Sequence, residues 1–350
     1  MIKLTVKNPN KIIIIKPSSL GDVVHSLPFL NAVKTCFPRA EIHWVIAKGL
    51  EGLLEGHPMI NKLWIINKDA WKKIKQAKST IKEIKELFMQ LKKEKFDIVI
   101  DLQGLLRSGI LTTATSAPVR VGFTEAREGS SFFYTHKVEG GRNIHAVDRY
   151  LKIAHFLGCD INDVCFPLPL SFNSSPVTRH SSLSEDYAVI VHGARWKTKI
   201  WPPEKFGELS SKLPLRTVVV GGKGDIDAAN EIVNLSKGNA ISLAGKTDLK
   251  ELIEVMRGAQ FVVSNDSGPM HIAAALGISV FAIFGPTDPI KTGPYGEGHT
   301  VIREDISCAP CLKRTCDDLK CMKNLSVENV YEVIKTKILN NSRTGLSFRT

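Results

Sequence analysis

The sequence predicts an α/β protein built from two Rossmann-like domains, and three observations support this prediction. Short apolar runs alternate with amphipathic segments along nearly the whole chain, which is the pattern of strand–helix units around a parallel sheet. Residues 171–184 are rich in serine, lack an apolar period and are typical of a linker. The 350 residues suit two domains better than one core. We therefore expect one domain at 1–170 and another at 185–350.

The first domain is predicted to contain five strands connected by helices. The strands are short runs rich in β-branched residues, at 11–15, 41–47, 62–66, 96–101 and 119–121. Helices are expected to begin near five positions, namely Asp22, Gly49, Trp71, Leu105 and Ala146.

Residues 72–95 form a strongly basic amphipathic segment. Its apolar residues recur every three or four positions, and lysines occupy the remaining faces. The apolar stripe consists of Ile74, Ala77, Ile81, Ile84, Leu87 and Leu91. We expect this stripe to pack on the sheet, and the lysines to attract an anionic membrane surface as a secondary role.

The second domain repeats the alternation. Its predicted strands lie at 187–192, 216–220, 240–243, 261–264 and 279–284, and a last helix covers 326–339. Parallel sheets bind ligands at the carboxyl ends of their strands. The predicted binding site is therefore a deep cleft between the carboxyl ends of the two sheets.

Composition and charge exclude several classes of protein. With 43% hydrophobic residues the chain is neither disordered nor fibrous. It contains no apolar run long enough to span a bilayer and begins without a secretory signal, so we expect a cytoplasmic protein whose cysteines are thiols or metal ligands. The net charge is +12, and residues 1–170 carry 25 Lys and Arg against 16 Asp and Glu. The first domain is expected to meet an anionic partner, although a surface merely rich in lysine is an alternative.

The first candidate site is the segment Lys16-Pro17-Ser18-Ser19-Leu20-Gly21-Asp22, between a strand and a helix. Such a junction points backbone amides and the positive end of a helix toward a ligand. Neither a GxGxxG nor a Walker sequence is present, which weakens dinucleotide and P-loop interpretations. Asp22 has two interpretations, as the N-cap of the helix or as a catalytic base with His25 one turn further on. The residues alone favour the cap.

The second candidate is the loop 192–202, where Arg195, Lys197 and Lys199 precede a helix marked by Pro202. Cations at a helix start suit a phosphate clamp, and the alternative is a solvated basic loop.

The third candidate is Ser264-Asn265-Asp266-Ser267-Gly268-Pro269-Met270-His271, a strand end that runs into a helix. Asp, Ser and Gly in succession predict a tight turn with inward amides, and Pro269 fits the first helical turn. His271 is interpreted as a phosphate ligand or as an ordinary helical residue. The segment 285–289 predicts another such turn.

Two further patterns are compatible with metal ions. Asp225 and Asp227 have a spacing that suits a divalent cation, but helix capping explains both carboxylates more simply. Four cysteines within fourteen residues are compatible with a structural tetrahedral zinc site, and four reduced thiols are the alternative. These cysteines are Cys308, Cys311, Cys316 and Cys321.

Together these segments resemble the ADP-heptose:lipopolysaccharide heptosyltransferases, glycosyltransferase family 9. The resemblance covers almost the whole chain and rests on six motifs in order: KPSSLGDVVHSLP, IDLQGLLRS, the loop 199–201, SNDSGPMHIAAALG, FGPTDP and CAPCLKRTC. It implies the GT-B architecture, two facing Rossmann-like domains with the acceptor bound mainly by the first and the nucleotide sugar by the second. It also implies that the helix at 326–339 packs back on the first domain.

The resemblance assigns roles by position. Asp22 matches the general base, and Lys199 matches the residue that binds the diphosphate. The donor-site turn corresponds to Asp266, Ser267, Gly268 and His271. Thr247 and Asp225 match positions near the adenosine. This chain departs from the family at Ala194 and Arg195, where close relatives have hydroxyl residues for the phosphate. Arg195 is expected to help Lys199 at the diphosphate.

The implied reaction is one inverting displacement that needs no metal and no cofactor, since the ADP-sugar is a substrate. The implied acceptor is lipid A carrying Kdo, or a heptose already added to it, with Ser19, Arg107 and Arg127 as candidate contacts. An anionic acceptor explains the basic first domain without nucleic acid and implies a peripheral position at the inner face of the cytoplasmic membrane.

Two rival functions differ in class. One is a GT-B enzyme for another nucleotide sugar, either a glycosyltransferase or an epimerase. The other is a nucleotide- or nucleic-acid-binding protein without catalysis. The aromatic content of only 7% argues against the second, because single strands stack on aromatic side chains.

Overall fold

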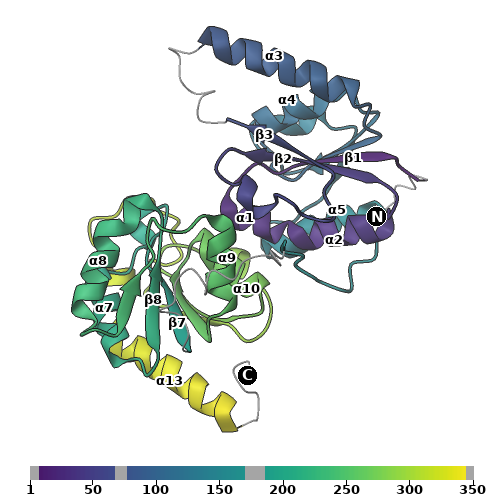
Figure 1. Cartoon of the computed structure of the whole chain (residues 1–350). Helices are drawn as coiled ribbons and strands as arrows, with labels where there is room; N and C mark the ends of the chain where they lie inside the picture. Colours follow the sequence, from purple (N-terminus) through teal and green to yellow (C-terminus); the bar gives the residue numbers. More distant parts are fainter. Residues whose placement is uncertain (1–7, 68–76, 170–185, 344–350) are drawn as a thin grey trace. The chain divides into compact units, whose positions relative to one another are not determined.

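Two six-stranded parallel sheets form the framework of the computed structural model, one in each of the units Met1–Pro169 and Leu170–Thr350 (Figure 1). The structure describes residues 8–67, 77–169 and 186–343, so the predicted linker at 171–184 lies outside the described residues. The α/β prediction is confirmed. The predicted cleft between the domains stays a prediction.

The first sheet has the strand order β3-β2-β1-β4-β5-β6. Its strands are β1 (Lys11–Ile15), β2 (Glu41–Ala47), β3 (Lys62–Ile66), β4 (Ile98–Asp101), β5 (Val119–Phe123) and β6 (His136–Val138). The chain runs outward from β1 to β3 and then returns to β4 on the other side of β1. The loops after β1 and β4 therefore diverge, and such a switch point is where open α/β sheets bind ligands.

Helices cover both faces of this sheet. On one face lie α1 (Leu20–His25), α2 (Leu27–Cys36) and α5 (Ala146–Phe156), and on the other lie α3 (Ala77–Lys93) and α4 (Leu106–Ala114) (Figure 1). Because both faces are covered, the four isoleucines of β1 are fully buried.

Two local predictions for the first unit were wrong. The helix expected near Gly49 is a single 3₁₀ turn, Glu51–Leu53, because Gly49 and Gly56 at φ 89° and 78° limit the segment to a short turn. Strand β6 was not predicted, since three residues give too short an apolar pattern.

The second half of the basic amphipathic segment packs on the sheet as expected, whereas the packing predicted for Ile81 was wrong. Leu91 is buried, and Leu87 and Phe88 join the apolar cluster of β1, β2 and β3. Ile81, near the start of α3, is 52% exposed. Residues 72–76 of the predicted helix lie outside the described residues.

The second sheet has the order β12-β11-β10-β7-β8-β9, with its switch point between β7 and β10. Its strands are β7 (Tyr187–Val191), β8 (Arg216–Val220), β9 (Ala240–Ser242), β10 (Phe261–Asn265), β11 (Ser279–Ile283) and β12 (Thr300–Ile302). The three-residue edge strand β12 was not predicted.

On one face of this sheet lie α7 (Pro203–Lys212), α8 (Ile226–Leu235) and α13 (Val327–Arg343), and on the other lie α9 (Leu249–Arg257) and α10 (Gly268–Ala275) (Figure 1). Two shorter helices are α11 (Pro289–Thr292) and α12 (Lys320–Lys323).

Helix α13 is held in the core of the second unit. Val327, Val330 and Ile334 are buried in the same apolar cluster as Trp201 and Phe206. The apolar face of this last helix is therefore used within the second unit, and its packing on the first domain stays a prediction. Of the helices in the described part of the chain, none has the length and apolar character that a bilayer span requires.

Candidate active site

Asp22 lies at the switch point of the first sheet, in the third position of α1. Ser19 is the N-cap, and its backbone N–H and Oγ donate hydrogen bonds to Asp22 Oδ2 at 2.9 and 2.6 Å. Asp22 thus accepts hydrogen bonds from the N-cap residue of α1 and is not the N-cap itself. The interpretation of Asp22 as the N-cap was wrong, because the helix begins at Leu20, directly after the extended residue Ser19. The carboxylate remains 41% exposed and therefore accessible to a substrate hydroxyl.

Beside this carboxylate lies a buried lysine to which the sequence analysis gave no role. Lys16 is 3% exposed, and its Nζ lies 3.8 Å from Asp22 Oδ1 and 3.5 Å from the carbonyl oxygen of Leu102. The hydroxyl of Tyr150 donates to Asp22 Oδ1 at 3.5 Å, and its ring lies 5.2 Å from the Lys16 ammonium. Burial lowers the pKa of Lys16, but Asp22, Tyr150 and Asp101 more than offset this, so its pKa lies above the usual value.

The loop after β4 forms the neighbouring wall. The fully buried carboxylate of Asp101 accepts hydrogen bonds from the N–H groups of Gln103 and Gly104 and from the Tyr134 hydroxyl, at 2.8, 3.0 and 2.7 Å. Burial raises the pKa of Asp101, although these donors counteract it. Gln103 Oε1 in turn accepts from the N–H of Ser18 at 3.4 Å, which fixes this loop against the loop after β1.

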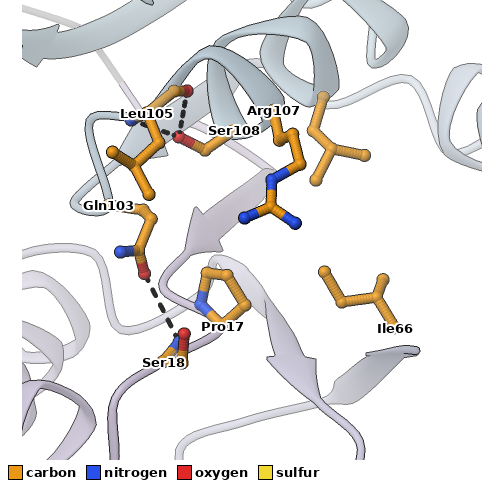
Figure 2. A pocket seen from close by; sticks show the side chains of 8 residues that line it. Pro17, Ser18, Ile66, Gln103, Leu105, Arg107 and Ser108 are labelled. Atoms are coloured by element: carbon orange, nitrogen blue, oxygen red, sulfur yellow. Dashed lines mark hydrogen bonds between the residues drawn. The ribbon is translucent and has the colours of Figure 1, made fainter. Parts of the chain in front are cut away.

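A small pocket of about 40 Å³ opens next to these loops (Figure 2). It is lined by Pro17, Ser18, Ile66, Gln103, Leu105, Arg107, Ser108 and Leu111. Its walls are mostly apolar, and the Arg107 side chain extends from the start of α4 toward the loop at Pro17 (Figure 2).

Arg107 and Arg127, the two candidate acceptor contacts, lie on segments that are bonded to each other. The N–H of Arg127 donates to the carbonyl oxygen of Gly104 at 2.9 Å, and the Glu128 carboxylate accepts from the N–H of Leu106 at 3.1 Å. Both arginine side chains are exposed. Two cations at one edge of the first unit suit an anionic ligand.

In the second unit the structure brings together Lys199 and Asp266, from the loops after β7 and β10. Lys199 Nζ lies 2.7 Å from Asp266 Oδ2, and the Thr287 hydroxyl donates to the same oxygen at 2.5 Å. Asp266 is buried, and Lys199 is largely so. The Lys199 ammonium also lies 4.7 Å from the centre of the Trp196 ring.

Asn265 connects these two loops. Its Nδ2 donates to the carbonyl oxygen of His192 at 2.6 Å, and its Oδ1 accepts from the N–H of Trp201 at 3.2 Å. Ser267 is the N-cap of α10, which begins at Gly268, and His271 is buried within that helix. The predicted donor-site turn is therefore a junction that Asn265 ties to the loop after β7 by hydrogen bonds.

The residues matched to the adenosine lie on the other side of β7, by the carboxyl ends of β8 and β9. Asp225 Oδ2 accepts from the N–H of Gly222 at 2.8 Å, as the capping interpretation requires. A Cβ at Gly193 or Gly221 would lie 2.9 or 2.7 Å from the Asp225 side chain, so a larger residue at either position would force that side chain to shift. Thr247 is half-buried in the turn after β9.

Arg195 is exposed in the loop after β7. It precedes Lys199 in the same loop. Among the described contacts, none joins the Arg195 side chain to Asp266.

The four-cysteine segment is not assembled as a metal centre. Cys308 and Cys316 are exposed and Cys321 is buried, and all are free thiols. Across residues 8–67, 77–169 and 186–343, no three His, Cys, Asp or Glu side chains are grouped to hold a metal ion. The zinc interpretation thus has no support from this geometry.

Residues 84–322 match the model of glycosyltransferase family 9 (heptosyltransferase). The chain belongs to glycosyltransferase family 9. This family 9 glycosyltransferase is 31% identical to lipopolysaccharide heptosyltransferase 1 of Pseudomonas aeruginosa, over 87% of each chain. It is 30% identical to the Escherichia coli K12 protein of the same name, over 84% of this chain and 93% of that one.

The fold is shared with solved structures. Escherichia coli heptosyltransferase WaaC with ADP superposes with a TM-score of 0.76 at 26% identity, covering 93% of this chain and 99% of WaaC. A family 9 glycosyltransferase of Veillonella parvula gives a TM-score of 0.79 at 24% identity, over 95% and 98% of the two chains. The two sheets of this glycosyltransferase thus have the GT-B architecture.

Proposed function

We propose that this glycosyltransferase transfers a heptose from ADP-heptose to a Kdo or heptose residue of the lipopolysaccharide inner core. Its relatives are named lipopolysaccharide heptosyltransferases, and WaaC was solved with ADP. The observation that carries the proposal is the accessible Asp22 carboxylate, held by Ser19, Lys16 and Tyr150 at the switch point of the first sheet.

Asp22 is the proposed general base. It takes the proton of the acceptor hydroxyl as that oxygen attacks the anomeric carbon of the heptose, and ADP leaves from the opposite face. A carboxylate near a helix N-terminus is stabilised as an anion, which makes it a weaker base. A late proton transfer, in a reaction with oxocarbenium-like character, tolerates this weakness.

Lys199 is the proposed stabiliser of the leaving diphosphate. Negative charge grows on ADP as the glycosidic bond breaks, and preorganised donors lower the energy of that transition state. The ion pair with Asp266 fixes the Lys199 ammonium before the donor binds. Arg195 and the α10 junction of Ser267 and Gly268 are proposed to assist it, and Asp225 and Thr247 to contact the adenosine side.

The acceptor is proposed to bind at the first unit. Arg107 and Arg127 suit the carboxylates and phosphates of the acceptor. Ser19 is hydrogen-bonded to Asp22 and is therefore placed to contact the acceptor beside the proposed base. The basic first unit, with exposed lysines along α3, supports a site of action at the anionic inner face of the cytoplasmic membrane.

The test is incubation of the purified protein with ADP-heptose and defined truncated lipopolysaccharides, with the product mass measured by mass spectrometry. Asp22→Asn is expected to reduce turnover by roughly two to four orders of magnitude, the usual range for positioned acid–base catalysis. Asp163→Asn, at an exposed loop position, is the matched control and should retain full turnover.

Two outcomes would contradict the proposal. Near wild-type turnover of Asp22→Asn would remove this residue from the mechanism. A clear preference for UDP over ADP and GDP in isothermal titration would show that the donor is a different nucleotide sugar.

A further inference from the structure

The cysteine-containing segment 308–322 packs directly against the donor-side loops of the second unit. The Thr198 hydroxyl donates to the carbonyl oxygen of Lys313 at 2.9 Å. The N–H of Leu312 donates to the carbonyl oxygen of Pro286 at 2.8 Å. A Cβ on Gly285 would lie 2.5 Å from Met322 Sδ, so the Met322 side chain packs closely against the Gly285 backbone. Three separate contacts thus fix this segment over the loops after β7 and β11.

These contacts bring a second cation to the aromatic ring that Lys199 already uses. The guanidinium carbon of Arg314 lies 4.8 Å from the centre of the Trp196 ring, and Lys199 Nζ lies 4.7 Å from the same centre. Both distances are within the range of cation–π attraction. Trp196 therefore holds two cations that are 115 positions apart in the sequence.

The charges at this ring do not balance. Lys199 is paired with the buried Asp266 at 2.7 Å, so that pair is neutral overall. Arg314 adds an exposed positive charge. With that pair neutral, Arg314 leaves a net positive charge at the ring, which attracts an anion. A guanidinium is also the group that matches phosphate oxygens with paired hydrogen bonds.

We propose that Arg314 binds the diphosphate of the nucleotide sugar together with Lys199, with Trp196 positioning both cations. The donor site then consists of the loop after β7 and the cysteine-containing segment. This proposal rests on the proposed function for the identity of the donor, but it concerns the diphosphate, which any nucleoside diphosphate sugar contains. The role of the cysteine-containing segment is therefore to hold the Arg314 cation where the leaving diphosphate binds.

The experiment measures binding of ADP, AMP and inorganic pyrophosphate to the full chain by isothermal titration. Arg314→Gln is expected to weaken ADP and pyrophosphate about tenfold, as expected for loss of one charge-assisted contact. AMP, with one phosphate fewer, should lose less. Arg314→Lys should retain part of the affinity, because it keeps the charge without the paired donors.

The matched control is Arg216→Gln. Arg216 is exposed at the amino end of β8, the edge of the sheet opposite to the donor-side loops, so this variant removes the same charge elsewhere. It should bind ADP as the wild type does. Unchanged denaturation midpoints for both variants show that each is folded.

Trp196→Leu provides a second, independent measurement. If the ring positions Arg314, the double variant with Arg314→Gln should lose little more affinity than Trp196→Leu alone, because the loss of the ring already disturbs Arg314. Fully additive losses would overturn the positioning role of Trp196.

Wild-type affinity of Arg314→Gln for pyrophosphate and ADP would overturn the proposal, as would an equal loss in Arg216→Gln. If Arg314→Gln weakens pyrophosphate but the wild type prefers UDP to ADP, the diphosphate site stands and the ADP-heptose assignment fails.

Discussion

Lys16 and Asp22 depend on each other at the end of β1. Holding a charge in surroundings as buried as those of Lys16 costs several kcal/mol unless a partner compensates it. The partner is Asp22, whose Oδ1 lies 3.8 Å away, with Tyr150 bonded to the same oxygen. The ion pair with Lys16 and the hydrogen bond from Tyr150 orient the carboxylate, and Lys16 acts as a positioning residue of the proposed base.

Lys16→Met tests this dependence, because methionine preserves much of the volume and removes the charge. We expect kcat/KM to fall about ten- to hundredfold, the effect of losing a hydrogen-bonded or paired charge. Without the ammonium the Asp22 carboxylate is harder to keep ionised, so the acidic limb of the rate profile should move to higher pH. Tyr150→Phe, which removes only one hydroxyl, should have a smaller effect. An unchanged pH profile in Lys16→Met would refute the positioning role.

At the scale of the elements, Glu94 connects the end of α3 to two strands. Its carboxylate accepts from Lys62 Nζ of β3 at 2.7 Å and from Lys11 Nζ of β1 at 2.9 Å. The hydrogen bonds from Lys62 and Lys11 lower the pKa of Glu94 from its ordinary 4.5 to about 2. Since the group stays ionised more readily in the folded chain, it stabilises the fold above pH 4.5, and this contribution disappears as the pH falls toward 2.

Glu94→Gln should therefore destabilise the first unit by about 1 kcal/mol near neutral pH, a value typical of partly exposed ion pairs. The difference from the wild type should shrink between pH 4.5 and about 2, as urea denaturation at several pH values would show. Glu86→Gln on the exposed face of α3, where the Lys82 ammonium lies 3.9 Å away, should change stability little. A difference that grows toward low pH would contradict the assigned role.

At the scale of the whole molecule, the positive charge is divided unevenly. Residues 1–170 carry 25 Lys and Arg against 16 Asp and Glu, and the remaining 180 residues carry 22 against 19. In the first unit, several lysines of α3 are exposed on the faces that do not pack on the sheet, among them Lys82, Lys85, Lys92 and Lys93. Each cation near an anionic bilayer contributes about 1 kcal/mol of attraction.

We therefore expect the chain to bind vesicles that contain anionic lipid, and to leave neutral vesicles unbound in flotation assays. Binding should decrease as salt rises from 0.05 to about 0.5 M, because screening shortens the range of the charges. Replacing the four lysines of α3 by glutamine should weaken binding more than the same change at four exposed lysines of the second unit, Lys237, Lys323, Lys335 and Lys337. Equal losses in the two variants would show that only total charge matters.

Much of the fold was predictable because its signals are local. Buried parallel strands such as 11–15 and 41–47 are continuous apolar runs, and their predicted bounds agree with β1 and β2. The edge strands β6 and β12 were not predicted, because three residues are too few to show an apolar pattern. Asp22 and Lys199 could be named as candidates for the same local reason, since each follows a recognisable strand within a motif, and their catalytic roles stay a prediction.

The sequence by itself determined the α/β class, the family and the positions of the candidate loops, because these depend on which residues are neighbours along the chain. Only the tertiary structure decided that Lys16 is buried against Asp22, that Lys199 pairs with Asp266, and that Arg314 reaches the Trp196 ring. The last two contacts join segments far apart in the sequence, and the first depends on how the loop after β1 folds and is buried. The partner of each charged side chain is therefore set by the tertiary structure.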